Sequence, residues 1–206
     1  LARGGLRTLV LEKNKYAGGM ASTVELFDGY QFEIAGSVLF PPQADIVADL
    51  GLDTLRTVET TVMSVNLGGP DDEPMIFYRD LEQLMMHLAD KHGAETMMGM
   101  AELLAWADAP ARALGRFDVR TPPRTLDEMY ACANTEAERA AITEMLFGSA
   151  VDVLNRLFPD KDKQRTMRGM LAFLAVNSTY RGPYSPGSAT CLAFALAAPP
   201  GAAMIE

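Results

Sequence analysis

The feature that most constrains the fold is a change in the spacing of apolar residues near Tyr78. Before this point, short apolar runs are separated by glycine-rich turns, which is typical of strands. After it, apolar residues recur at the spacing of one helix face, beginning with Leu81, Leu84, Met85 and Leu88. The sequence therefore predicts an α+β chain whose first third is rich in strands and whose remainder is mainly helical.

Capping residues mark several helix starts in the second part. Asp80 precedes the first helical stripe and is a good N-cap residue. Thr125 and Thr135 each stand three residues before a glutamate, which is the S/T-x-x-E pattern of a capping box. Further helical stripes are expected over residues 97–107, 142–157, 167–174 and 188–198, with residues 159–162 ending the second of these.

The first part has the signals of strands and turns. Residues 24–40 predict a hairpin-like or extended pair, and residues 45–52 predict a short helix that stops at Gly51. Residues 57–67 and 74–78 predict two strands joined by a turn over residues 68–72. A β-hairpin is the simplest interpretation of this last pattern.

The apolar run Arg7–Glu12 follows a glycine turn and ends on an acid. A continuous run of this kind is typical of a strand buried on both faces of a parallel sheet. Leu1–Gly5 resembles the last turn of a helix and its glycine stop, so the run is expected to be the second strand of a βαβ unit. We expect the chain to be an internal piece of a longer protein.

Charge and length exclude several classes of function. The 206 residues carry 18 basic and 27 acidic side chains, a net charge of −9, and nucleic-acid binding is excluded because it needs a basic face. The apolar run Leu192–Ala198 is far shorter than the roughly 20 residues of a membrane span, so only a peripheral membrane contact stays open. Cys132 and Cys191 match no metal or disulfide pattern, which favours a reducing, cytoplasmic location.

The two histidines, His87 and His92, are five residues apart in a predicted helix. This spacing places them on different helix faces, as solvated or capping side chains. We therefore expect no metal site.

Glu12 and the pair Gly18-Gly19 are the residues with the strongest chemical signal. In a dinucleotide-binding βαβ unit, an acid at the end of the second strand accepts hydrogen bonds from the adenosine ribose. Paired glycines let backbone amides approach a pyrophosphate, because no Cβ stands in the way. An ordinary strand-end glutamate followed by a glycine turn is the alternative.

The motifs in combination are more specific. The segments R-T-L-V-L-E-K (7–13), G-G-M-A-S-T (18–23) and F-D-G-Y-Q-F-E-I-A-G-S (27–37) resemble the FAD-binding N-terminus of the phytoene desaturase-like NAD(P)/FAD-dependent oxidoreductases. The resemblance is greatest to the group of the pyridine nucleotide-disulphide oxidoreductase domain protein two. Residues 169–189 also resemble that group. Its G-x-G-x-x-G fingerprint would precede Leu1.

The resemblance implies a set of FAD contacts. Glu12 would bind the adenosine ribose with Lys13 beside the adenine, and Gly36 and Ser37 would approach the isoalloxazine. Met20 stands where many relatives have arginine, so that position offers no charged contact. The residues implied along the pyrophosphate and ribityl chain are Gly18, Gly19, Met20, Ala21, Ser22 and Thr23.

The resemblance also implies two domains, a partial Rossmann-like FAD-binding domain over 1–56 and a mainly helical substrate domain with a β-hairpin over 57–206. The activity would be dehydrogenation of a small lipophilic substrate, with hydride passing to the flavin. Methionines on helix stripes would form an adaptable apolar wall or simply the core. They are Met85, Met86, Met97, Met98, Met100, Met167 and Met170. Phe173, Tyr180 and Tyr184 would line a pocket or brace a loop.

Because the G-x-G-x-x-G segment is not in this sequence, the chain alone is expected to hold FAD weakly or not at all. One alternative is a non-catalytic helical binding or interaction module derived from a flavoprotein. An NAD(P)-dependent enzyme without flavin is a weaker alternative, because Gly18-Gly19 follows the FAD pattern.

Overall fold

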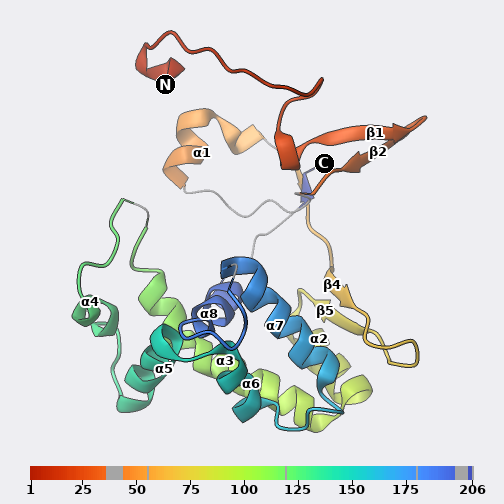
Figure 1. Cartoon of the computed structure of the whole chain (residues 1–206), viewed down its shortest axis with the longest axis vertical. Helices are drawn as coiled ribbons and strands as arrows, with labels where there is room; N and C mark the ends of the chain where they lie inside the picture. The colour runs from red at the N-terminus through yellow and green to blue at the C-terminus, as the bar shows by residue number, and fades with distance from the viewer. Residues whose placement is uncertain (36–43, 55, 119, 180, 198–203, 206) are drawn as a thin grey trace. The chain divides into compact units, whose positions relative to one another are not determined.

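The computed structural model describes residues 1–35, 44–54, 56–118, 120–179, 181–197 and 204–205. The chain divides into two compact units, residues 1–59 with 200–206 and residues 60–199 (Figure 1). The predicted domain boundary lay after residue 56. Helices and short antiparallel strands make up both units, so the fold is α+β, as the change in apolar spacing predicts.

The first unit contains two small antiparallel strand pairs. β1 (Thr23–Phe27) and β2 (Tyr30–Glu33) form a hairpin in which Val24 lies opposite Phe32. β3 (Thr57–Val58) pairs with β6 (Met204–Ile205). The short helices are η1 (Ala2–Gly4), η2 (Gly19–Ala21), α1 (Ala44–Leu50) and η3 (Leu52–Thr54). Helix α1 ends at Gly51, whose φ of 66° confirms the predicted glycine stop.

The predicted strand Arg7–Glu12 is wrong. These residues are irregular, and Leu9, Val10 and Leu11 are between 81% and 85% exposed. A strand that is buried on both faces needs hydrogen-bonding neighbours at both edges. No described strand lies beside this run, so its apolar residues have nothing to pair with or pack against.

The second unit begins with the predicted hairpin. β4 (Val62–Asn66) and β5 (Met75–Tyr78) are antiparallel and enclose the turn over residues 67–74. The strand predicted over 57–67 is interrupted between Val58 and Val62, because its two halves pair with different partners. Met75 and Phe77 are buried, whereas the alternate residues of β5 are partly exposed. The hairpin therefore turns one face of β5 to the helices.

Seven helices follow the hairpin in the described residues. They are α2 (Leu81–His92), α3 (Ala94–Leu114), α4 (Leu126–Tyr130), α5 (Glu136–Phe147), α6 (Ala150–Leu157), α7 (Arg165–Thr179) and α8 (Ala189–Ala197). The caps Asp80, Thr125 and Thr135 are confirmed, since each side chain accepts a hydrogen bond from the backbone amide three residues on. Helix starts were thus encoded locally.

Helix α3 is the centre of the second unit and packs against α2, α5, α6 and α8. Gly99 lets α3 pack closely against the end of α6, because a Cβ there would lie 2.5 Å from the carbonyl oxygen of Leu157. Leu103, Ile142 and Leu192 are fully buried around this axis. The core is therefore continuous and mainly helical, and strand β5 adds Met75 and Phe77 to it.

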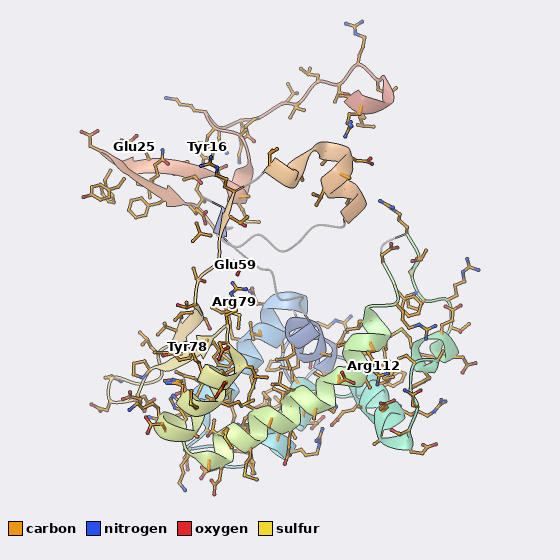
Figure 2. All side chains as sticks on the ribbon, turned by 180° about the vertical axis from the view of Figure 1, so that it is seen from behind. Tyr16, Glu25, Glu59, Tyr78, Arg79 and Arg112 are labelled. Carbon is orange, nitrogen blue, oxygen red and sulfur yellow. The ribbon has the colours of Figure 1, made fainter. Side chains whose placement is uncertain are left out.

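Arg112 at the end of α3 ties this helix to its neighbours (Figure 2). The guanidinium donates to the carbonyl oxygen of Cys132 at 2.8 Å, to Glu138 Oε1 at 2.7 Å and to Asp108 Oδ2 at 3.1 Å. Hydrogen bonds from the Asn134 amide, together with the charge of Arg112, hold the pKa of Glu138 below its usual value. This network fixes α5 against the C-terminal end of α3.

Candidate functional site

Glu12 and Lys13 lie in the irregular, exposed N-terminal segment. Within the described part of the chain, the Glu12 side chain has one hydrogen bond, in which Oε1 accepts from the amide of Asn14 at 2.8 Å. Glu12 does not stand at the end of a strand, so the structure does not hold its carboxylate in the predicted position. The other oxygen of the carboxylate is free to accept a further donor.

The predicted segment Gly18–Thr23 forms a tight turn. Gly18 and Gly19 have φ values of 104° and 59°, in the region that favours glycine. Ser22 is buried, and its hydroxyl donates to the carbonyl oxygen of Ala17 at 2.6 Å. A Cβ on Gly18 would lie 2.9 Å from Ser22 Oγ, so this turn excludes any side chain at that position.

Two backbone hydrogen bonds join this turn to Ile34 and Ala35, which follow β2. The amide of Ile34 donates to the carbonyl oxygen of Ser22 at 3.0 Å, and the amide of Ala35 donates to that of Met20 at 3.1 Å. The turn therefore lies beside the two residues that precede Gly36, although it is more than ten positions away in sequence. Gly36 and Ser37 themselves lie outside the described residues.

The side chain of Ser22 is committed to the turn itself, whereas the other side chains point outward. Met20 is 74% exposed, and Ala21 and Thr23 are also exposed. A ligand at this turn would therefore meet backbone and small side chains. Sequence spacing alone did not indicate the structural role of Ser22.

Five of the seven methionines belong to the core or pack against it. Met100 and Met167 are buried, and Met85 and Met97 pack partly against the core. Their spacing matches the helix faces that α2, α3 and α7 turn inward. Met86 and Met98 are instead more than half exposed. Met170 alone among the seven lines a described cavity.

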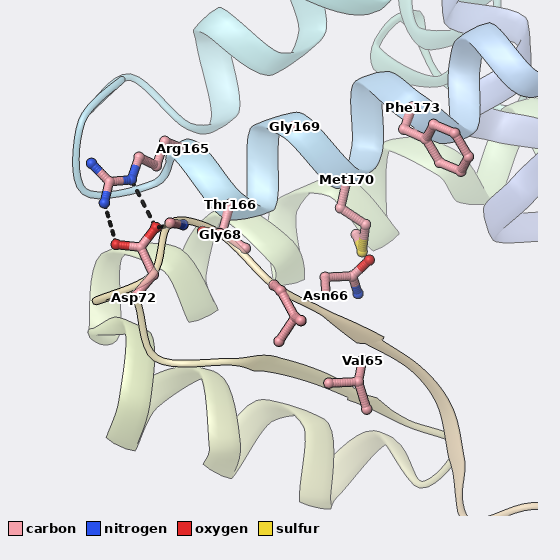
Figure 3. Close-up of a pocket in the computed structure, with 11 residues that line it drawn as sticks. Val65, Asn66, Gly68, Asp72, Arg165, Thr166, Gly169, Met170 and Phe173 are labelled. Atoms are coloured by element: carbon pink, nitrogen blue, oxygen red, sulfur yellow. Dashed lines mark hydrogen bonds and ion pairs between the residues drawn. The ribbon is translucent and has the colours of Figure 1, made fainter.

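That cavity has a volume of about 500 Å³ and lies between the β4–β5 turn and α7 (Figure 3). It is lined by Val65–Gly69 and Asp72 from the hairpin and by Arg165, Thr166, Gly169, Met170 and Phe173 from α7. Phe173 was predicted either to line a pocket or to brace a loop, and it lines this cavity. Tyr180 lies outside the described residues.

Asp72 and Arg165 close one end of this cavity. Arg165 Nε donates to Asp72 Oδ2 at 3.0 Å, and Nη2 donates to Oδ1. The hydrogen bond from Arg165, followed by that from the Gly69 amide, lowers the pKa of Asp72 below its usual value. Sequence analysis missed this pair because 93 residues separate its members.

A second cavity of about 820 Å³ runs along α5 and is lined mainly by charged and small residues. Arg156 and Glu144 on its wall form an ion pair of 2.6 Å, and Arg139 lies over the ring of Tyr130. Its cations are therefore already held by groups of the protein. Trp106, which also lines this cavity, has a buried Nε1 that finds no hydrogen-bond partner among the described residues.

The prediction that His87 and His92 lie apart on solvated faces is wrong. Their rings are 5.3 Å apart, and His87 Nε2 accepts a hydrogen bond from the amide of Ile76. Strand β5 packs against α2, and its Tyr78 ring lies 5.5 Å from that of His87. Burial, followed by the charge of His87, lowers the pKa of His92.

The described residues show neither a metal-binding cluster nor a membrane-spanning helix. Nowhere in the described ranges do three His, Cys, Asp or Glu side chains gather as a metal ion requires. No helix in those ranges has both the length and the apolar composition needed to cross a bilayer.

Comparison with known proteins adds no assignment. A scan against protein-family models finds no match to this chain, and a search of curated proteins finds no relative.

Proposed function

We propose that this chain is part of an FAD-dependent oxidoreductase that dehydrogenates a lipophilic substrate, and that its first unit contributes to the flavin site. One observation carries the proposal. The glycine turn at Gly18 is hydrogen-bonded to Ile34 and Ala35. The turn implied in pyrophosphate binding therefore lies beside the two residues that precede Gly36 in the sequence.

The local chemistry fits a dinucleotide. A Cβ on Gly19 would meet no atom within 4 Å, and the adjacent Met20 is 74% exposed, so this side of the turn is accessible to a ligand. Gly18–Thr23 would hold the pyrophosphate and ribityl chain, and Glu12 would accept from the ribose hydroxyls. Bound there, the flavin would supply the hydride acceptor.

The second unit, which is mainly helical, would be the substrate domain of such an enzyme.

Glu12→Ala in the complete protein tests this function. We expect weaker FAD binding by about 1 to 3 kcal/mol, because a charged acceptor for the ribose is lost. Glu25→Ala is the matched control, since Glu25 is equally exposed and its carboxylate also accepts a local amide, that of Gly29 at 2.8 Å. Equal FAD dissociation constants for Glu12→Ala and wild type would contradict the assignment.

A non-catalytic interaction module is the second candidate. The hairpin favours it, because Leu26, Phe27 and Tyr30 are each more than 60% exposed and would suit a protein partner. The gene upstream of the codon for Leu1 distinguishes the two. A strand followed by G-x-G-x-x-G in that frame supports the flavoenzyme, whereas an authentic start codon at Leu1 supports the module.

A further inference from the structure

The cavity between the β4–β5 turn and α7 is kept open by a missing side chain. Gly169 stands in the interior of α7, where glycine is less favourable than alanine. A Cβ built on Gly169 meets no atom within 4 Å, so close packing does not require glycine here. The space over Gly169 is the cavity itself.

Gly68 across the cavity shows the opposite case. A Cβ on Gly68 would meet Asp72 Oδ2 and would lie 2.6 Å from Thr166 Oγ1, so packing of the turn on α7 excludes a side chain there. Close packing therefore requires glycine at position 68. At position 169 no contact requires glycine, and the residue faces the open cavity.

The walls of the cavity are apolar and unusually exposed. Leu67 is 77% exposed, Phe173 is 63% exposed and Val65 is 55% exposed, and all three line the same space as the buried Met170 (Figure 3). When an apolar ligand covers exposed apolar surface in a concave site, the free energy of the system falls, because apolar area is removed from water. A volume of about 500 Å³ lies within the range of small-molecule sites.

The polar end of the cavity carries no net charge. Asp72 neutralises Arg165 through two hydrogen bonds. Asn66 lies away from this pair, beside Met170 (Figure 3), and its side-chain amide nitrogen donates to Ser64 Oγ at 3.1 Å, which leaves its carbonyl oxygen as an acceptor. A charged head group would have to compete with this ion pair. An uncharged polar end group would not.

We propose that this cavity binds an elongated apolar molecule with an uncharged polar end group, whose chain lies across Gly169. The end group lies toward the Asp72–Arg165 pair, and the chain is covered by Leu67 and Phe173. The site is built wholly from the second unit, so it does not rest on flavin binding by the first.

The test is a fluorescence titration of the whole chain with the methyl ester of a polyene fatty acid as the probe. Wild type should bind it saturably, and Gly169→Leu should weaken binding at least tenfold by filling the cavity. Gly169→Ala should retain binding, because it adds one methyl group in open space. Asn177→Leu adds the same leucine at an exposed position of α7 that does not line the cavity, and should bind as wild type does.

Thermal melts of the variants establish that each is folded, and both Gly169 variants are expected to melt no lower than wild type. Equal probe affinity in wild type and Gly169→Leu would overturn the proposal, as would no binding to wild type. The free polyene fatty acid tests the end group. Tenfold tighter binding of the acid than of its ester would overturn the uncharged end group.

Discussion

Asp72 and Arg165 stand 93 residues apart in sequence and form a two-point ion pair that joins the β4–β5 turn to the first turn of α7. The carboxylate is mostly buried, with 18% of its side chain exposed, whereas the guanidinium is 61% exposed. Oδ2 also accepts from the amide of Gly69. The Asp72 carboxylate thus binds its own turn through the Gly69 amide and helix α7 through Arg165.

Asp72→Asn should therefore reduce stability at neutral pH and change its acid dependence. The pKa of Asp72 is lowered in the folded chain from a usual value of 3.8. Its contribution is therefore present above about pH 4 and is lost as the pH falls through the folded pKa. Urea unfolding should show a deficit for the variant at pH 7 that narrows at pH 3. The exposed neighbour Asp71 provides the control Asp71→Asn, and an equal deficit in that variant would contradict the role of Asp72.

His92 should make the second unit less stable in mild acid. Burial lowers its pKa in the folded chain below the usual 6.5, so the unfolded chain binds a proton more readily. The stability that depends on neutral His92 is complete above about pH 6.5 and is lost as the pH falls toward the folded pKa. The nearby carboxylate of Glu73 reduces this shift without reversing it.

His92→Gln removes this titration. The urea midpoint of the variant should fall less than that of wild type between pH 7.5 and pH 5.5. A proton-linked NMR titration of the two imidazoles provides the direct measurement. A His92 resonance that titrates above 6.5 would contradict the prediction.

Ser188→Ala should destabilise the junction between α6 and α8. Ser188 is fully buried, and its hydroxyl accepts from the amide of Ala150 at 2.9 Å and donates to the carbonyl oxygen of Pro183 at 3.1 Å. Alanine leaves both backbone groups without this partner, which costs about 1 to 3 kcal/mol. Denaturant unfolding measures the loss. Ser64→Ala, at an exposed hydroxyl, should stay within about 0.5 kcal/mol of wild type.

The same change at Gly68 and Gly169 should have opposite effects. Gly169→Ala should raise the free energy of unfolding by roughly 0.5 to 1 kcal/mol, because alanine is the better helix former and meets no neighbour. Gly68→Ala should lower it, because the new methyl group collides with Asp72 and Thr166. Parallel thermal melts compare the two variants. A gain in Gly68→Ala would mean that the turn on α7 is looser than the structure shows.

The helices of the second unit were predictable because their signals are local. Asp80, Thr125 and Thr135 each act on a backbone amide only three residues away, and the apolar spacing fixed which faces turn inward. The hairpin of β4 and β5 was predictable for the same reason, since its turn residues lie between the two strands. The glycine turn at Gly18 was also visible in the sequence.

The features that sequence reasoning missed depend on partners that are distant or outside the described chain. Residues Arg7–Glu12 have the composition of a buried strand, but a strand exists only where a neighbour supplies hydrogen bonds. Helical spacing separated His87 from His92, yet their rings lie 5.3 Å apart at the end of α2.

The sequence by itself therefore determined the α+β composition, the helix starts and the positions that need glycine in turns, because each depends on contacts between near neighbours. Only the tertiary structure decided that Asp72 meets Arg165, and that the space over Gly169 becomes a cavity with apolar walls. Both depend on how the β4–β5 hairpin docks on α7. That docking is set by burial of apolar side chains along the whole unit, which no local pattern specifies.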